Sequence, residues 1–224
     1  MNGNVTICAP FRNSAIKVSG FMNGVYELDY PRQQIRIIAV EGDSQDDTRQ
    51  ILSTWYAYDR RVSLLTCNTG KPHYGNVVHP ERFAVLAQVF NTALDAVDLD
   101  WSDYVVFTPS DVCFGRDILA RLMAHDKDMI APFFWGADGL FHDTWGFTHG
   151  GQEFGKFGRE QVSSLYGDAP IEMDTVGGMV LMRADVLRAG CRYTASEVDR
   201  GLCKAAKAQG FTVWADPATY IHHL

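Results

Sequence analysis

The stretch Gln34–Thr48, QIRIIAVEGDSQDDT, decides the fold. Its first part, Gln34–Val40, is a continuous apolar run rich in β-branched side chains, which is typical of a parallel strand buried on both faces. The second part, Glu41–Thr48, is acidic and supplies N-cap residues and first-turn carboxylates for a helix that we expect to continue to about Tyr56. The stretch therefore predicts one strand–loop–helix unit of an α/β protein.

Similar units lie on both sides of this stretch. They predict strands at Val5–Ala9 (ending at Pro10), Val62–Thr66 and Tyr104–Phe107, and helices from Ser14 to Leu28 and from Pro80 to Val97. This alternation predicts an α/β fold with a doubly wound, mostly parallel sheet flanked by helices. In such folds ligands bind beyond the carboxyl ends of the strands. The acidic loop and Asp111 both lie on that edge of the predicted sheet.

From residue 132 to 167 the regular pattern gives way to glycines and aromatic residues. A loop of this length inside a compact domain is uncommon and is usually functional. We therefore expect a lid or platform in which Trp135 and Trp145 bind the acceptor. Regular elements are expected again as a strand at Val176–Met182, a helix at Glu197–Gln209 and a strand at Thr212–Ala215. Because we find no internal repeat and no interdomain linker, we expect residues 1–224 to form one domain.

The composition is that of an ordinary globular protein, with 46% hydrophobic residues, 21% charged residues and a formal net charge of -7. The negative charge argues against broad electrostatic attraction to nucleic acid or anionic lipid. The apolar runs are far shorter than the roughly 20 residues that span a bilayer, and the N-terminus lacks the features of a secretory signal. The five scattered cysteines fit reduced core thiols better than disulfides. We therefore expect a cytoplasmic location.

Two places along the chain offer metal ligands. Asp111 comes shortly after the strand that ends at Phe107, at the carboxyl edge of the predicted sheet. A carboxylate there can bind Mg²⁺ or Mn²⁺, and it can equally cap a helix that begins near Arg116. The tail Tyr220–His223 adds two imidazoles, which taken alone are more typical of a loose chain end than of a metal site.

Charged residues and glycines near the predicted strand ends are further candidates. Asp43 could accept a hydrogen bond from a base N–H, while Arg12 and Arg82 could pair with phosphate oxygens. The alternative is that all three are solvated surface charges. Glu197 either favours the N-terminus of the last helix or acts on an acceptor hydroxyl. The two glycines of Val176–Met179 mark either a bulge or the close approach of a ligand.

Taken together, several segments resemble the GT-A fold of nucleotide-sugar glycosyltransferases. The resemblance is to the Anp1/Mnn9-like mannosyltransferase family in particular and, more distantly, to the large inverting family two. It runs nearly end to end, and the segments follow one another in the order that the family has. They are residues 6–13, 28–31, 41–48, 103–112, 174–178, 183–186 and 210–222. The resemblance implies a single-domain GT-A fold with a Rossmann-like sheet.

The resemblance also implies a role for each candidate residue. Donor binding falls to Pro10, Arg12, Asp43, Arg82, Ser110, Gly177 and Gly178. The metal, Mn²⁺ or Mg²⁺, is held by Asp111 and by His222, which resembles the late histidine of the family's metal site. Catalysis beside the acceptor falls to Glu197 and Asp174. One departure from the family is that Pro109 stands where the Asp-x-Asp motif has its first aspartate.

These residues predict a metal-dependent glycosyltransferase that moves a sugar from a UDP- or GDP-linked donor to an acceptor hydroxyl. The acceptor stays open among a glycan, a small molecule, a protein and a modified nucleic-acid base. The stereochemistry also stays open, since Anp1-like enzymes retain the anomeric configuration and family two inverts it. One alternative, suggested by Pro109, is a non-catalytic nucleotide-sugar- or carbohydrate-binding module. Another is a nucleotidyltransferase, although Ala9–Asn13 lacks the glycine-rich phosphate loop expected of that class.

Overall fold

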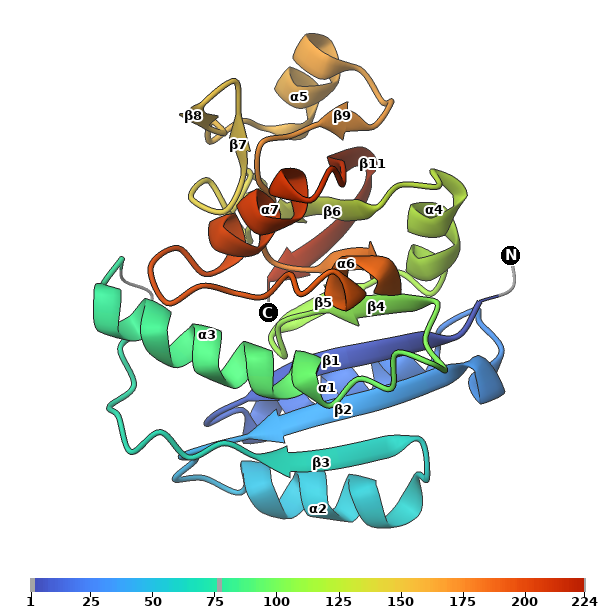
Figure 1. Cartoon of the computed structure of the whole chain (residues 1–224), viewed down its shortest axis with the longest axis vertical. Helices are drawn as coiled ribbons and strands as arrows, with labels where there is room; N and C mark the ends of the chain where they lie inside the picture. The colour runs from blue at the N-terminus through green and yellow to red at the C-terminus, as the bar shows by residue number, and fades with distance from the viewer. Residues whose placement is uncertain (1–2, 76–77, 224) are drawn as a thin grey trace.

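The computed structural model describes residues 3–75 and 78–223. Within them, nine strands form one sheet in the order β3-β2-β1-β4-β10-β6-β11-β5, with β9 paired to β11 (Figure 1). The first half of the sheet is parallel, as predicted. It consists of β1 (Val5–Phe11), β2 (Ile35–Glu41), β3 (Val62–Thr66) and β4 (Tyr104–Phe107). The carboxyl ends of these four strands therefore lie along one edge.

Helices cover both faces of the sheet (Figure 1). One face carries α1 (Ala15–Tyr26), α2 (Thr48–Tyr58) and α4 (Ile118–Ala124), and the other carries α3 (Pro80–Asp95), α6 (Ala184–Arg188) and α7 (Asp199–Ala208). A short 3-10 turn, η1 (Arg32–Gln34), leads into β2. Side chains alternate along β1, so that Cys8 packs in the core beneath α3 whereas Ile7 and Ala9 pack beneath α1. This burial on both faces explains the apolar strands in the sequence.

The second half of the sheet is mixed, so the sheet is parallel over most of its paired residues but not throughout. In this half, β10 (Val180–Arg183) runs antiparallel between β4 and β6 (Met129–Trp135), β11 (Val213–His223) is parallel to β6, and both β5 (Val112–Phe114) and β9 (Ile171–Glu172) are antiparallel to β11. The chain reaches β10 from the segment that follows β6, beyond the carboxyl edge. β10 therefore starts at that edge and runs in the direction opposite to β4 and β6.

Residues 132–167 form ordered structure rather than the expected long loop. They contain the end of β6, the hairpin of β7 (Thr148–His149) and β8 (Gln152–Glu153), and α5 (Arg159–Tyr166). Aromatic packing holds the segment together: the rings of Phe133, Phe141 and Phe154 have centroids 5.0, 5.1 and 5.4 Å apart. Contacts of this kind leave no helical or strand period in the sequence, so the pattern predicted a loop.

Element boundaries differ from the prediction at several points. β1 continues through Pro10 because β4 pairs with β1 only as far as Cys8, so the missing N–H costs no ladder bond on that side. β10 begins at Val180 instead of Val176, and α7 begins at Asp199 instead of Glu197. β11 extends to His223 and thereby brings the C-terminal tail into the sheet.

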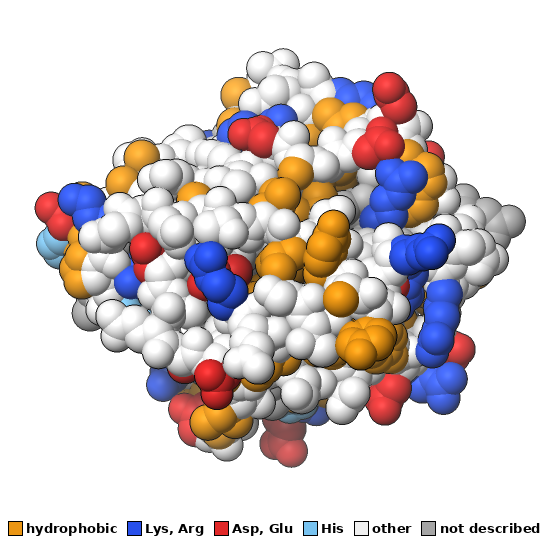
Figure 2. All heavy atoms as spheres, turned by 90° about the horizontal axis from the view of Figure 1, so that it is seen from below, with side chains coloured by type: hydrophobic (Ala, Val, Ile, Leu, Met, Phe, Trp, Pro, Cys, Tyr) orange, Lys and Arg blue, Asp and Glu red, His pale blue; other side chains and the backbone are white. Residues whose placement is uncertain are grey.

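The surface around α2 and β3 is seen in Figure 2, which views the molecule from below. Apolar side chains lie near the centre of this face, and Lys and Arg side chains gather along one side with acidic side chains among them. α2 contributes the exposed rings of Tyr56 and Tyr58. This face therefore lacks the unbroken basic stripe that is typical of nucleic-acid binding. In the part of the chain that the structure describes, no helix has the length and apolar character needed to cross a membrane.

Candidate active site

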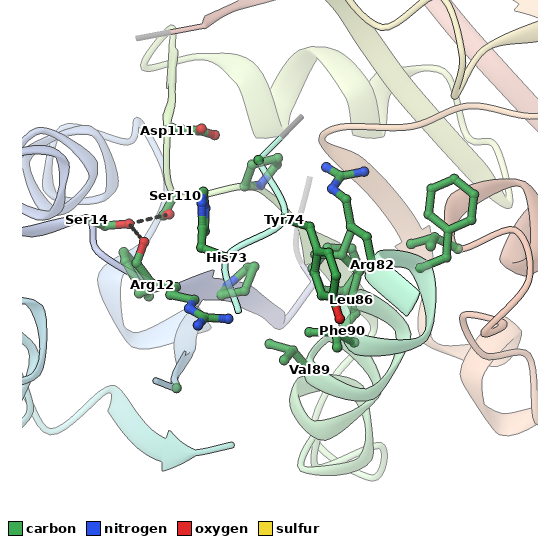
Figure 3. Close-up of a pocket in the computed structure, with 18 of the residues that line it drawn as sticks. Arg12, Ser14, His73, Tyr74, Arg82, Leu86, Val89, Phe90, Ser110 and Asp111 are labelled. Carbon is green, nitrogen blue, oxygen red and sulfur yellow. Dashed lines mark hydrogen bonds between the residues drawn. The ribbon is translucent and has the colours of Figure 1, made fainter. Parts of the chain in front are cut away.

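A cavity of about 750 Å³ opens at the carboxyl ends of β1, β2 and β4, between the loops that follow these strands and α3. Figure 3 shows Arg12, Ser14, Ser110 and Asp111 on one side and, on the other, Arg82 together with the apolar side chains of Leu86, Val89 and Phe90. The predicted site residues that line the cavity are Pro10, Arg12, Asp43, Arg82, Ser110, Asp111, Trp145 and Gly178. The cavity thus brings together residues from both halves of the chain.

The loops after β2 and β3 are pressed together at Gly42 and Asp43. A Cβ at Gly42 would overlap the carbonyl oxygen of Cys67, so only glycine permits this approach. Asp43 has a φ of 56°, a left-handed conformation that Asp adopts more readily than most residues. Its Oδ2 accepts hydrogen bonds from the N–H and the hydroxyl of Thr69, at 2.8 and 2.7 Å, and the hydroxyl in particular holds the pKa of Asp43 below its usual value. Asp43 is therefore an ionised acceptor at the cavity wall.

Arg12 ties the loop after β1 to the loop after β3. Its Nη2 donates to the carbonyl oxygen of Lys71 at 2.7 Å, and its Nη1 donates to that of Pro72 at 3.4 Å. The hydroxyl of Ser14 lies 3.4 Å from that of Ser110, on the loop after β4 (Figure 3). Hydrogen bonds between loops thus fix this part of the cavity, and a phosphate group would meet a guanidinium that is already positioned.

Asp111 and His223 meet at the cavity. Oδ2 of Asp111 lies 3.3 Å from Nε2 of His223 and 3.4 Å from Nζ of Lys17. The ring of His142 stacks on that of His223 with the centroids 4.8 Å apart. Burial, with the adjacent His223, lowers the pKa of His142. A carboxylate from the loop after β4 and an imidazole from the end of β11 therefore converge.

Asp111 and His223 fit a divalent cation that also binds the donor. Mg²⁺ and Mn²⁺ commonly take one or two ligands from the protein and complete their coordination with phosphate oxygens and water. Both residues line the cavity and are within reach of one ion. Over residues 3–75 and 78–223, no group of three or more His, Cys, Asp and Glu side chains is arranged to hold a metal. A cation here would therefore need ligands from a bound substrate.

His222, the expected partner of Asp111, lies on the other face of β11. Side chains alternate along a strand, and it is His223, not His222, that lines the cavity. Nε2 of His222 lies 3.3 Å from Nη2 of Arg159, and burial, assisted by that positive charge, lowers the pKa of His222. The structure thus moves the histidine of the candidate metal site by one residue, to His223.

Two carboxyl groups and a guanidinium form another wall of the cavity, where Asp143, Asp199 and Arg82 lie. Burial, with the neighbouring charge of Asp143, raises the pKa of Asp199 to about 8. Burial also raises the pKa of Asp143. Desolvation lowers the pKa of Arg82, and the two acids oppose that shift. At neutral pH the two carboxyl groups therefore retain a proton, which allows this wall to give or take one.

Close backbone contacts hold the two acids in place. The N–H of Gly146 donates to Oδ1 of Asp143 at 2.8 Å, and a Cβ on either Gly146 or Gly177 would overlap Oδ2 of Asp143. Val198, just before Asp199, has a φ of 44°, which is strained for a β-branched residue. Strain of this kind persists only where the surrounding structure imposes it and is common at active sites. Gly177, which was expected to bind the donor, does not line the cavity and packs against Asp143 instead.

Glu197, Asp174 and Trp135 do not line the cavity. Oε1 of Glu197 pairs with Nζ of Lys204 at 2.6 Å. Oδ2 of Asp174 accepts a hydrogen bond from the N–H of Gly151 at 2.7 Å. Trp135 is buried and instead borders a separate small hollow next to α5. Asp199, the first residue of α7 and two residues after Glu197, does line the cavity.

Trp145, the other expected acceptor residue, does line the cavity. Its ring lies 4.8 Å from that of Phe83 and 4.4 Å from the guanidinium of Arg200, measured to the ring centroid. The cavity residues that sequence reasoning missed are Lys17, Thr69, His142, Asp143 and Asp199, and it named His223 only as one of the two imidazoles of the tail. A prediction that extended the last strand through the tail would have placed His222 and His223 on opposite faces of the sheet, since neighbouring side chains of a strand alternate. Asp143 carries no comparable signal, because its position depends on a hydrogen bond from the N–H of Gly146 and on packing against the distant Gly177.

Comparisons with known proteins agree with this arrangement. The model of the family "Glycosyltransferase family 25, N-terminal domain" matches residues 2–156. The chain is 26% identical to the mannan polymerase II complex anp1 subunit of Schizosaccharomyces pombe, over 98% of this chain and 64% of that protein. It is 27% identical to human procollagen galactosyltransferase 2, over 63% of this chain and 24% of that protein. The chain thus spans less than two thirds of the length of either relative.

Solved structures share the fold. A mannosyltransferase from Pyrobaculum calidifontis, in complex with GDP-Man and Mn²⁺, superimposes with a TM-score of 0.64 and 16% identity, over 100% of this chain and 57% of that one. TarS 1–349 from S. aureus, in complex with UDP-GlcNAc, gives a TM-score of 0.65 and 15% identity, over 98% of this chain and 58% of that one. These likenesses confirm the predicted GT-A fold, and the anp1 relative agrees with the predicted resemblance to Anp1-like enzymes.

Proposed function

Because the chain belongs to glycosyltransferase family 25 through its N-terminal domain, we propose that it is an enzyme that transfers a sugar from a nucleotide-sugar donor to an acceptor hydroxyl. The observation that carries the proposal is the convergence of three kinds of group on one cavity. These are an ionised acceptor for a base at Asp43, a carboxylate–imidazole pair at Asp111 and His223, and a partly protonated acid pair at Asp143 and Asp199.

We propose that Asp111 and His223 hold Mn²⁺ or Mg²⁺ together with the donor diphosphate. The cation would neutralise the charge that develops on the departing nucleoside diphosphate. Asp43 would accept a hydrogen bond from the base, which stacks near Pro10. Arg82 would pair with a phosphate oxygen of the donor. Its positive charge is already in the cavity, where it interacts with the two acids.

We propose that Asp199 takes the catalytic role that the sequence assigned to Glu197. The acceptor oxygen would form a bond to the anomeric carbon while the bond from that carbon to the phosphate oxygen breaks. The proton of the acceptor hydroxyl would pass to the carboxylate of Asp199. A base is most effective when its pKa is near the working pH, and the raised pKa of Asp199 meets this condition. Direct displacement with Asp199 as base would invert the anomeric configuration, which a stereochemical assay of the product tests.

Trp145 lines the same cavity and supports an acceptor with a sugar or another flat apolar surface. We leave the acceptor open among a glycan, a small molecule, a protein and a modified base. We also propose that residues 1–224 form one domain, which the continuous sheet supports. A cytoplasmic location is supported by the five free thiols, which persist in a reducing compartment.

Release of nucleoside diphosphate tests the function. The protein would be incubated with UDP- and GDP-linked sugars in the presence of Mn²⁺ or Mg²⁺, and free nucleoside diphosphate would be measured with and without a chelator. We expect release that requires the cation. If a donor binds in calorimetry but neither sugar nor nucleoside diphosphate is released, even with candidate acceptors present, the protein is a nucleotide-sugar-binding module and the catalytic proposal is wrong.

A further inference from the structure

The two carboxylate oxygens of Asp43 differ in how many donors they already meet. Oδ2 accepts from the N–H of Thr69 at 2.8 Å, from the Thr69 hydroxyl at 2.7 Å and from the N–H of Gly70 at 3.2 Å. Among the described residues, Oδ1 meets only the N–H of Gly70, at 3.3 Å. A carboxylate offers about four lone-pair positions, two on each oxygen. Oδ2 is therefore filled, and Oδ1 has room for one more donor.

This asymmetry is built into the fold. Gly42 allows the loop after β2 to touch the carbonyl of Cys67, which places Asp43 beside the loop after β3. The N–H of Asp43 donates to Oδ1 of Asn68 at 3.1 Å, so the backbone is anchored as well as the side chain. The hydroxyl of Thr69 also accepts from the N–H of Lys71 at 3.3 Å, which directs its own proton to Asp43. Oδ2 can therefore accept a hydrogen bond from a ligand only if its bonds to Thr69 break.

Nucleobases differ in the number of N–H donors that they present to a carboxylate. Uracil presents one, N3–H, flanked by two carbonyl groups. Guanine presents two on one edge, N1–H and the 2-amino group, which pair best with both oxygens of a carboxylate. Hypoxanthine has the shape of guanine but lacks the 2-amino group, so it presents N1–H alone. A donor that loses water and meets no acceptor costs affinity.

We propose that Thr69 is a specificity-determining residue that limits Asp43 to reading a single N–H donor, so that this protein prefers a uridine diphosphate sugar to a guanosine diphosphate sugar. Thr69 acts through Asp43 and is a positioning residue, not a catalytic one. The proposal rests on the proposed function, because it takes Asp43 to be the group that reads the base of the donor.

Calorimetry with three nucleotides tests the proposal on the wild-type protein. UDP, GDP and inosine diphosphate would be titrated into the full chain in the presence of Mn²⁺. We expect UDP to bind about tenfold more tightly than GDP, since an unpaired donor costs a factor of this order. Inosine diphosphate should bind at least as tightly as GDP, because the 2-amino group finds no free acceptor. The ratio of these two affinities isolates that one group from the size of the purine.

The N–H of Gly70 is shared between the two oxygens of Asp43. In the Thr69→Val variant the hydroxyl is gone, so that Oδ2 keeps the N–H of residue 69 and gains one free position when the N–H of Gly70 turns to Oδ1. We expect GDP to gain about threefold or more relative to inosine diphosphate, while UDP changes little. Thr69→Ser keeps the hydroxyl and should restore the wild-type ratio. Thr54→Val is the matched control, because the hydroxyl of Thr54 donates to the carbonyl of Gln50 within α2, away from the cavity; it should leave all three affinities unchanged.

The outcomes separate this proposal from the function on which it rests. Wild-type protein that binds GDP tenfold more tightly than inosine diphosphate would overturn the single-donor readout and leave nucleotide-sugar transfer standing. The same holds if Thr69→Val is folded and keeps the wild-type ratio. If that variant is unfolded in a thermal melt, the three wild-type affinities decide alone. If none of the three nucleotides binds, the proposed function itself is wrong.

Discussion

The two walls of the cavity are built in different ways. The N-terminal wall, from residues 10 to 111, consists of loops that directly follow parallel strands together with one side of α3, and hydrogen bonds between those loops hold Arg12 and Asp43. The C-terminal wall, from residues 134 to 223, contains two acids with raised pKa values and a strained Val198. Hydrogen bonds hold the charged side chains of the first wall in place before a ligand arrives, whereas the second wall keeps unfavourable features that a reaction can use. We therefore expect the first to bind and the second to do chemistry.

Removing Asp111 should have the largest effect, because the two walls meet at its contact with His223. Asp111→Asn should lower kcat/KM for donor cleavage about 10³-fold, since the diphosphate loses the cation that neutralises it. Circular dichroism should show an intact fold. Asp29→Asn, which breaks a surface pair with Arg116, is the control and should be as active as the wild type. Full activity of Asp111→Asn would remove the metal proposal.

A smaller loss is expected at Asp199, which tests whether the C-terminal wall does the chemistry. Asp199→Asn should lower kcat by about 10²-fold or more with little change in KM, because it removes the group that takes the acceptor proton. Glu197→Gln, two residues away in sequence and paired with Lys204, should stay within a few-fold of the wild type. The reverse result would return the catalytic role to Glu197.

Substitutions of the two adjacent histidines, His222 and His223, compare the two faces of β11. We expect a smaller loss of activity here than for Asp199→Asn. His223→Ala should raise the Mn²⁺ concentration needed for half-maximal activity by about 10- to 100-fold. His222→Ala should leave that concentration unchanged, because its imidazole contacts Arg159 on the other face of β11. Metal titrations of both variants decide the matter. Equal effects of the two substitutions would show that the tail is rearranged when the donor binds.

The sequence predicted the N-terminal wall well because local rules determine it. A buried strand must end at the common edge, so the residues after Phe11, Glu41 and Phe107 had to meet there. The placement of Arg12, Asp43 and Asp111 follows from this topology. The GT-A fold and family resemblance are confirmed by the comparisons. The antiparallel strands of the second half of the sheet are a detail that the sequence pattern did not predict.

The C-terminal wall could not be predicted in the same detail because tertiary contacts determine it. The starting point of α7 follows from the strained turn at Val198, and the position of Asp143 follows from contact with Gly146 and Gly177. A shift of one residue along a strand changes which side chain faces the cavity. The sequence therefore pointed to the two segments that reach the cavity, but it chose His222 and Glu197, whereas His223 and Asp199 are the residues that line the cavity.

The smallest expected effect is a difference in how stability depends on pH. The pKa of Asp199 is raised from 3.8 to about 8 in the folded state, so the folded protein binds this proton more tightly than the unfolded chain. Stability from this group is therefore fully present below pH 4 and is lost as the pH rises towards 8, with a slope of at most about 1.4 kcal/mol per pH unit. Asp43 behaves in the opposite sense: its pKa is lowered, so its contribution is present throughout pH 5–8 and is lost only in acid.

Urea unfolding at pH 5, 6, 7 and 8, at constant ionic strength, measures this difference. Asp199→Asn mimics the protonated acid, so its free energy of unfolding should gain on that of the wild type as the pH rises. Asp43→Asn should show a constant difference from the wild type over the same range, because Asp43 is already ionised at pH 5 in both states. If the curves of the wild type and Asp199→Asn run parallel from pH 5 to 8, Asp199 titrates as an ordinary carboxylate. Asp199 would then hold no proton at neutral pH, and it would no longer distinguish the C-terminal wall from the N-terminal wall.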